Sequence, residues 1–251
     1  MLEFQTQLIF PTHAVAPAGP LPPGAERLSV ATSDGNTLQG VHIPPEVNPG
    51  ASILILGFGG NAWNGQDVAT YLHDLYPEAD VVAFHYRGYV PSTGSPSAEA
   101  LIADAPLVYD LAAAQVKPRK IVAVGFSIGS GVAAELASQR KLDGLILVTP
   151  FDSLKKVAEA MYPWLPIGPM FRHEMDAAGA LDHAHVPVAI VAAAHDEIVP
   201  TVRTDELRKQ VPNLVFDRTI GRAGHNDIYS RAEFQEAMRE ALATLLGAAN
   251  A

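Results

Sequence analysis

One stretch in the middle of the chain constrains the fold more than any other. An apolar, β-branched run over residues 121–126 ends in Gly125-Phe126-Ser127-Ile128-Gly129 and continues into a helix-forming run over residues 132–137. The first run predicts a buried strand and the second a helix, so the chain turns abruptly around Ser127. Glycines two residues before and after the serine keep Cβ atoms out of this crowded turn. The segment therefore predicts a buried strand joined to a helix by a strained turn with a serine at its tip.

This turn would make the serine available for chemistry. The Ser127 hydroxyl would stand exposed above the sheet, and the backbone N–H of Ile128 would lie at a helix N-terminus, where negative charge is stabilised. The Gly-x-Ser-x-Gly pattern alone is moderately specific, because a chance match in a chain of this length has a probability of about one in ten. Its position between a strand-like run and a helix-like run favours a nucleophile over a glycine-containing turn with an incidental serine.

The rest of the chain alternates strand-like and helix-like runs, which predicts a single α/β domain over residues 1–251. We expect a mostly parallel, doubly wound sheet of about eight strands with helices on both faces and ligand chemistry at the carboxyl ends of the strands. Residues 1–24 predict an extended N-terminal arm, and residues 151–186 a small cap or lid inserted between strands. Pro106 predicts a kink or break in the helix that contains it.

Composition excludes several classes of function. The chain has 27 acidic and 17 basic residues and no basic cluster, which argues against binding to nucleic acid or an anionic membrane and favours a small-molecule partner. It has no cysteine, so thiol nucleophiles and cysteine-ligated metals are excluded. No apolar run approaches the length of a membrane span, and the N-terminus lacks the pattern of a signal peptide, so we expect a cytoplasmic protein.

A serine nucleophile needs a base and a group that orients the base. Among the nine histidines, only His225 follows the last apolar strand on a glycine-containing loop, as the order serine, acid, histidine requires. Asp196, shortly after the strand-like run 188–191, is the expected acid, with Glu197 as the near competitor and Asp152 as the distant one. A solvated loop histidine and a helix-capping carboxylate are the simpler interpretations of these side chains.

The glycine-rich loop after the strand 53–56 allows two interpretations. Gly59 and Gly60 would let the backbone approach the substrate, with the N–H of Asn61 as the second oxyanion donor, although they also suit a simple turn. The segment 57–62 also matches the loose fingerprint of a dinucleotide-binding loop. The next strand, however, ends in Phe84-His85-Tyr86 and lacks the acidic residue that would bind a ribose.

No metal or other cofactor is expected. His183, His185 and His195 are close in sequence but come without a defined carboxylate ligand, so surface or core histidines are the better interpretation. Aromatic and methionine side chains are concentrated in the long connection over residues 151–186, either as the core of a small cap or as an apolar pocket facing the serine. The candidate substrate-binding residues are Trp63, Met161, Trp164 and Phe171.

These motifs together resemble the α/β-hydrolase superfamily over nearly the whole chain. The chain is most similar to the small-cap serine hydrolases of the abhydrolase-domain type, a group of esterases, protein depalmitoylases and relatives of serine aminopeptidases. The resemblance lies in these pieces: Gly60-Asn61-Ala62-Trp63-Asn64, Tyr86-Arg87-Gly88-Tyr89, Ser92-Thr93-Gly94-Ser95-Pro96, the turn at Ser127, Asp196 with Val199-Pro200, and Gly224-His225.

Two positions depart from the family pattern. Gly59 stands where the family usually has histidine, which predicts a looser oxyanion loop. His85 stands where the family usually has aspartate, which removes a structural carboxylate and predicts a second imidazole near the end of the sheet.

The sequence thus predicts an acyl-transfer hydrolase without a cofactor. Ser127 would attack an ester or thioester carbonyl, His225 would move the proton, Asp196 would orient His225, and the N–H groups of Asn61 and Ile128 would hold the oxyanion. Two alternatives stay open at this point: an amide hydrolase of the serine peptidase or aminopeptidase type, and a non-catalytic binding protein with the same fold.

Overall fold

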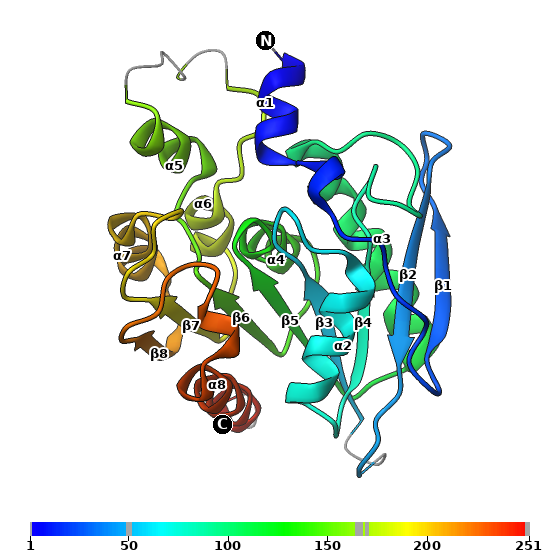
Figure 1. Ribbon diagram of the computed structural model, residues 1–251. Coiled ribbons are helices and arrows are strands. Elements are labelled where there is room, and N and C mark those ends of the chain that lie inside the picture. Colours follow the sequence, from blue (N-terminus) through cyan, green and yellow to red (C-terminus); the bar gives the residue numbers. More distant parts are fainter. Residues whose placement is uncertain (1, 49–51, 164–167, 169–170, 249–251) are drawn as a thin grey trace.

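The computed structural model describes residues 2–48, 52–163, 168 and 171–248, and its centre is one eight-stranded sheet (Figure 1). The strand order is β1-β2-β4-β3-β5-β6-β7-β8. β2 pairs antiparallel with both β1 and β4, and every other pairing is parallel. The predicted fold class is therefore confirmed. The strands are β1 (Glu26–Ala31), β2 (Thr37–Ile43), β3 (Ile53–Phe58), β4 (Asp80–Phe84), β5 (Lys120–Phe126), β6 (Gly144–Val148), β7 (Val188–Ala193) and β8 (Leu214–Ile220).

The central strands are buried on both faces. Every residue of β6 and β7 is buried, because helices cover the sheet from both sides and leave no face for polar side chains. The edge strand β1 alternates between exposed and buried or half-buried positions over Arg27–Ala31, as expected for a strand with one solvent-exposed face. The wholly apolar runs in the sequence therefore mark the middle of the sheet.

Helices form a layer on each face of the sheet. One apolar cluster joins the sheet to α2 and α8, for example through Val68 and Phe234. The other cluster joins it to α3, α4, α6 and α7, for example through Leu101 and Val132. The helices are α1 (Leu2–Ile9), α2 (Gly65–Leu75), α3 (Ala98–Val116), α4 (Ile128–Gln139), α5 (Leu154–Met161), α6 (Ala177–Asp182), α7 (Thr201–Gln210) and α8 (Ala232–Ala248), with 3-10 turns at Thr12–Ala14 and Ile228–Ser230.

The direction of the strand order changes between β3 and β5. The chain passes from β3 outward to β4 on one side, and β5 pairs with β3 on the other side. At such a switch point the loops leaving the two strands diverge, so ligands bind at the carboxyl ends of the strands there. The loop after β3 contains Asn61, and the turn after β5 contains Ser127.

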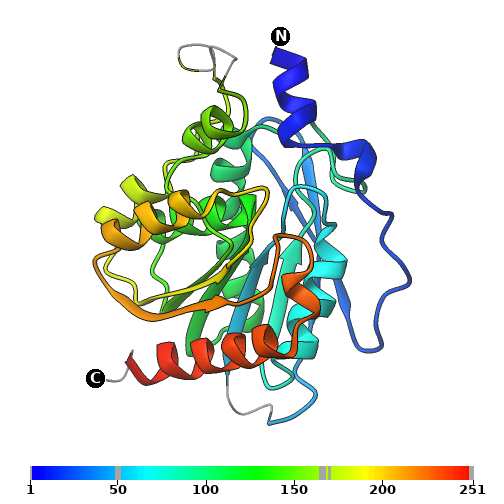
Figure 2. The same cartoon turned by 60° about the vertical axis from the view of Figure 1, so that its left-hand side comes forward.

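The N-terminal segment corrects one expectation. Residues 1–24 were expected to form an extended arm, but Leu2–Ile9 form α1 and Thr12–Ala14 form a 3-10 turn. The helix is held because Phe10, only 1% exposed, packs against the ring of His173, and Thr6 Oγ1 lies 2.9 Å from His173 Nε2. Figure 2 shows α1, in dark blue, at the same end of the molecule as α5. Tertiary contacts therefore order this segment.

Packing against the core also corrects the expectations for the cap at residues 151–186 and for the helix that contains Pro106. Within residues 151–186, α6 is not part of a cap, because Ala177 and Leu181 are buried and the helix packs against α4 in the regular layer. Of the kink or break predicted at Pro106, the break does not occur, because α3 continues from Ala98 to Val116. Buried side chains on both sides of the proline, Leu101 and Val108, fix the two halves of α3 on the same core.

Candidate active site

The turn after β5 holds Ser127 in a strained backbone conformation. The residue has φ 51° and ψ −116°, which a non-glycine residue seldom adopts. A Cβ atom on Gly125 would lie 2.3 Å from the carbonyl oxygen of Gly129, and one on Gly129 would lie 2.1 Å from the carbonyl oxygen of Phe58. Neither position therefore admits a larger residue, which explains both glycines of the motif.

Three side chains far apart in the sequence meet at this turn. His225 Nε2 lies 2.9 Å from Ser127 Oγ. On the other side of the imidazole, Nδ1 lies 2.8 Å from Asp196 Oδ2 and 2.9 Å from Oδ1. The side chains of His225 and Asp196 are only 6% and 4% exposed, so water competes little for these bonds. This geometry orients one imidazole nitrogen toward the hydroxyl and the other toward the carboxylate.

The structure also separates the three candidate acids. Asp196 Oδ1 accepts the N–H groups of Ile198 and Val199 at 2.9 and 2.7 Å, which fixes the carboxylate against the imidazole. Glu197 instead accepts the backbone N–H of His225 at 3.0 Å. The carboxylate of Asp152 is fully buried and pairs with lysine and arginine side chains at 3.0 and 3.2 Å. Of the three, only Asp196 contacts the imidazole.

The loop that holds His225 is supported by two carboxylates whose role there was not predicted from the sequence. Besides the bond from His225 N–H to Glu197, the N–H of Gly224 donates to Asp227 Oδ1 at 2.7 Å. Asp227 in turn pairs with Arg231. The sequence offered Glu197 only as an alternative acid, because no local pattern reveals which atom a carboxylate reaches.

The two expected oxyanion donors lie on either side of Ser127. Ile128 is the first residue of α4, so its N–H has no acceptor within the helix. On the β3 side, a Cβ atom built on Gly60 would lie 3.9 Å from Ser127 Cβ, so the backbone of the loop passes directly beside the serine. Asn61 follows Gly60 in this loop and is exposed.

A family model described as "alpha/beta hydrolase fold" matches residues 53–186, just over half of the chain. The chain belongs to the α/β-hydrolase family. An uncharacterised protein of Mycobacterium tuberculosis is 33% identical over 221 residues, which cover 84% of this chain and 78% of that protein. The lysophosphatidylserine lipase ABHD12 of Danio rerio is 33% identical over 172 residues, or 59% of this chain and 44% of the lipase.

Solved structures bear out the fold of this α/β hydrolase. An esterase of Pyrococcus furiosus superposes with a TM-score of 0.73 over 94% of this chain and 96% of the esterase, at 16% sequence identity. At that identity the similarity concerns the fold. The family and these relatives together support a hydrolase.

The loop after β3, where Gly59 departs from the family pattern, is held by hydrogen bonds from two tyrosines. Although Gly59 replaces a histidine, the hydroxyl of Tyr86 donates to its carbonyl oxygen at 2.8 Å. The hydroxyl of Tyr89 donates to the carbonyl oxygen of Asn61 at 2.5 Å. Hydrogen bonds from the neighbouring loop thus hold two carbonyl groups of this loop, while its looseness relative to the family stays a prediction.

At the second departure, His85 lies at the end of the sheet as an uncharged acceptor. It is 3% exposed, and its Nδ1 accepts the N–H of Gly65, the first residue of α2, at 3.3 Å. Burial lowers the pKa of His85 from 6.5 to about 4, so the imidazole is neutral at neutral pH. His85 therefore supplies an acceptor at the start of α2 without a carboxylate's charge.

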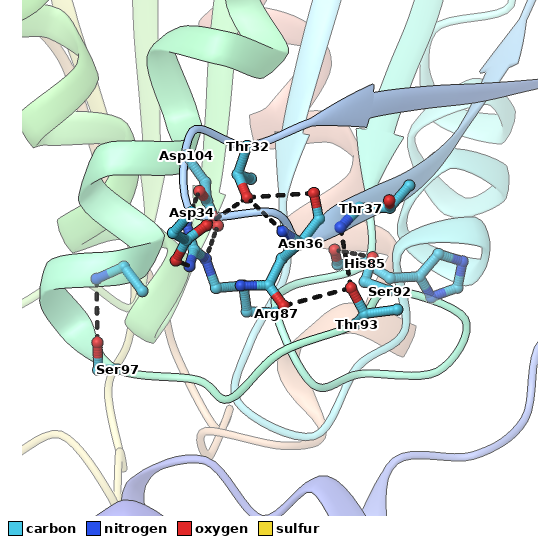
Figure 3. Close-up of polar contacts among 11 residues, drawn as sticks. Thr32, Asp34, Asn36, Thr37, His85, Arg87, Ser92, Thr93, Ser97 and Asp104 are labelled. Carbon is cyan, nitrogen blue, oxygen red and sulfur yellow. Dashed lines mark hydrogen bonds and ion pairs between the residues drawn. The ribbon is translucent and has the colours of Figure 1, made fainter.

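The loop that follows His85 is anchored by an arginine (Figure 3). Arg87 Nε and Nη2 donate to the two oxygens of Asp104 at 2.7 and 2.6 Å, and Nη1 reaches Asp34 in the β1–β2 turn. The Arg87 and Asp104 side chains are 11% and 9% exposed. Ser92 adds a hydrogen bond from its hydroxyl to the carbonyl oxygen of His85. The segment between β4 and α3 is thus fixed to α3 and to the β1–β2 turn.

The candidate substrate-binding residues have different surroundings. The indole of Trp63 packs at 5.2 to 5.4 Å between ring centroids against Phe126, Tyr71 and Tyr229. Met161 ends α5 and is 40% exposed, and Phe171 is half-buried in the chain before α6. Trp164 lies outside the described residues. A contact between any of these side chains and a substrate stays a prediction.

Among the residues that the structure describes, no group of three or more histidine, aspartate or glutamate side chains is arranged to hold a metal ion. In the same part of the chain, no helix combines the length and apolar character needed to cross a bilayer.

Proposed function

We propose that this protein is a serine hydrolase that cleaves a carboxylic ester or thioester of a small molecule through an acyl-enzyme. The observation that supports this most strongly is the unbroken series of contacts from Asp196 through His225 to Ser127. It lies at the carboxyl edge of the sheet, where the serine occupies a strained backbone conformation.

The first half of the reaction acylates the serine. Ser127 Oγ attacks the carbonyl carbon while His225 Nε2 takes the hydroxyl proton, and the carbonyl electron pair moves onto oxygen. The N–H groups of Ile128 and Asn61 donate to this oxyanion, and Asp196 stabilises the imidazolium. When the intermediate collapses, the bond to the alcohol or thiol breaks and His225 protonates the leaving group.

The second half uses water. His225 takes a proton from a water molecule, the resulting hydroxide attacks the acyl carbon, and the collapse of the second intermediate returns the proton to Ser127 Oγ. The products are a carboxylic acid and the free serine. The 27 acidic residues against 17 basic ones favour neutral or cationic acyl compounds over anionic ones. Trp63, Met161 and Phe171 are the candidates for contacts to the acyl group.

Ser127→Ala tests the proposal. We expect kcat for p-nitrophenyl esters to fall by about 10⁶, and a fluorophosphonate probe to label the wild-type protein but not the variant. Ser138→Ala is the matched control, because Ser138 lies on the same helix α4 with an exposed hydroxyl bonded to the carbonyl oxygen of Glu135. It should keep both activity and labelling.

The other outcomes separate the alternatives. Faster turnover of an aminoacyl anilide than of any ester, lost in Ser127→Ala, would replace the ester hydrolase with a peptidase. A wild-type protein that neither turns over these substrates nor reacts with the probe would be a non-catalytic binding protein of the same fold.

A further inference from the structure

The segment Tyr86-Arg87-Gly88-Tyr89 has a role beyond the proposed triad. Its two tyrosine hydroxyls reach across from the loop after β4 to the loop after β3 and donate to the carbonyl oxygens of Gly59 and Asn61. Between these two carbonyls, the carbonyl oxygen of Gly60 accepts the N–H of Trp63 at 3.3 Å. Three successive carbonyl groups of the oxyanion loop are therefore bonded within the protein.

Fixing a carbonyl group fixes the N–H of the same peptide unit. In a planar trans peptide the two groups point in opposite directions, so the bonded carbonyls of residues 59, 60 and 61 set the directions of the N–H groups of Gly60, Asn61 and Ala62. In the described part of the chain, none of these three N–H groups has a protein acceptor. They form a row of unused donors on the loop that passes beside Ser127.

The hydroxyls of Tyr86 and Tyr89 are suited to hold these carbonyl groups. Burial raises the pKa of both hydroxyls above their ordinary value, so both stay protonated and donate throughout the working pH range. The two rings meet edge to face, with centroids 5.6 Å apart, and Tyr89 is fully buried. Between them in sequence, Arg87 is bonded to both oxygens of Asp104 on α3. The hydroxyls thus project from a rigid base.

We propose that Tyr86 and Tyr89 are positioning residues for the oxyanion loop: their hydroxyls hold its carbonyl groups away from the reaction so that its N–H groups face the developing oxyanion. This inference rests on the proposed serine hydrolase function. It gives a reason for two tyrosines flanking the buried arginine.

Tyr86→Phe and Tyr89→Phe test the inference, because phenylalanine keeps the ring packing and removes only the hydroxyl. We expect kcat for a p-nitrophenyl ester to fall about tenfold or more in each variant, with KM changed less than twofold. The inhibition constant of a trifluoromethyl ketone, which forms a tetrahedral oxyanion with the serine, should rise by the same factor as kcat/KM falls.

Tyr76→Phe is the matched control. Tyr76 is also buried, at 1% exposed, and its hydroxyl also donates to a backbone carbonyl, that of Met238, at 2.8 Å. Its loss should reduce thermal stability as much as the other two changes while kcat and the ketone inhibition constant stay at wild-type values. The control therefore separates a loss of stability from the loss of kcat and of ketone binding expected in Tyr86→Phe and Tyr89→Phe.

Two results would overturn the inference. One is wild-type kcat in both Tyr86→Phe and Tyr89→Phe. The other is a loss of kcat that leaves the ketone inhibition constant unchanged, since the variants would then bind the oxyanion as well as the wild type does. Failure of the underlying function is distinguishable, because it would appear as a wild-type protein without ester turnover and without fluorophosphonate labelling at Ser127.

Discussion

Lowering the pH from 8 to 5 should destabilise this protein by about 2 kcal/mol through His85 alone. Burial lowers the pKa of this imidazole from 6.5 to about 4, with smaller effects from Asp67, which raises the pKa, and from Arg27, which lowers it. Between about pH 6.5 and pH 4 the imidazole of the unfolded chain binds a proton that the folded chain does not. Stability therefore falls as the pH drops through 6.5, and the loss levels off at about 3 kcal/mol below pH 4.

His85→Gln isolates this contribution, because a glutamine oxygen can accept the N–H of Gly65 as the imidazole does but takes up no proton. The measurement is the free energy of urea unfolding of both proteins at pH 8 and pH 5. Other groups that titrate contribute equally to both, so we expect the wild type to lose about 2 kcal/mol more than the variant. Equal losses in the two proteins would show that His85 titrates alike in the folded and unfolded states and would refute the reasoning.

Two further predictions concern carboxylates whose roles only the structure reveals. Asp104→Ala should lower the free energy of urea unfolding by about 3–5 kcal/mol, because it leaves the buried Arg87 without its bidentate partner. The control is Asp110→Ala, which breaks an exposed ion pair with Arg140 and should lower the free energy of unfolding by less than about 1 kcal/mol. Similar losses in the two variants would contradict this. Glu197→Ala should lower kcat for a p-nitrophenyl ester about tenfold by releasing the backbone N–H of His225, and Glu197→Gln, which keeps an acceptor oxygen, should retain most activity. Wild-type kcat in the alanine variant would exclude a positioning role.

Features that depend on a few adjacent residues could be predicted from the sequence. The apolar runs identified the buried strands, because a parallel sheet covered on both faces leaves no position for polar side chains. The turn at Ser127 could be located as well. Its backbone passes so close to α4 and β3 that only glycine fits at positions 125 and 129, so the constraint is visible in the residue types themselves.

Features that depend on which distant atoms meet were decided by the tertiary structure. Asp196, Glu197 and Asp152 all follow strands at the same edge of the sheet, and only their placement shows that Asp196 reaches the imidazole while Glu197 reaches the backbone of His225. No local pattern distinguishes them, because the length and direction of each loop set which atom its carboxylate contacts.

The same reason explains the expectations that were wrong. The first residues of the chain were expected to be extended, and α1 is fixed by contacts with a segment more than 160 positions away. The hydrogen bond from the Tyr86 hydroxyl to the carbonyl oxygen of Gly59 could not be predicted either, because its two residues lie 27 positions apart in the sequence. Sequence alone determined the strands, the turn and the residue types of the candidate site, because these depend on local sterics and on burial. The tertiary structure alone decided their partners, since a hydrogen bond depends on where two distant atoms lie.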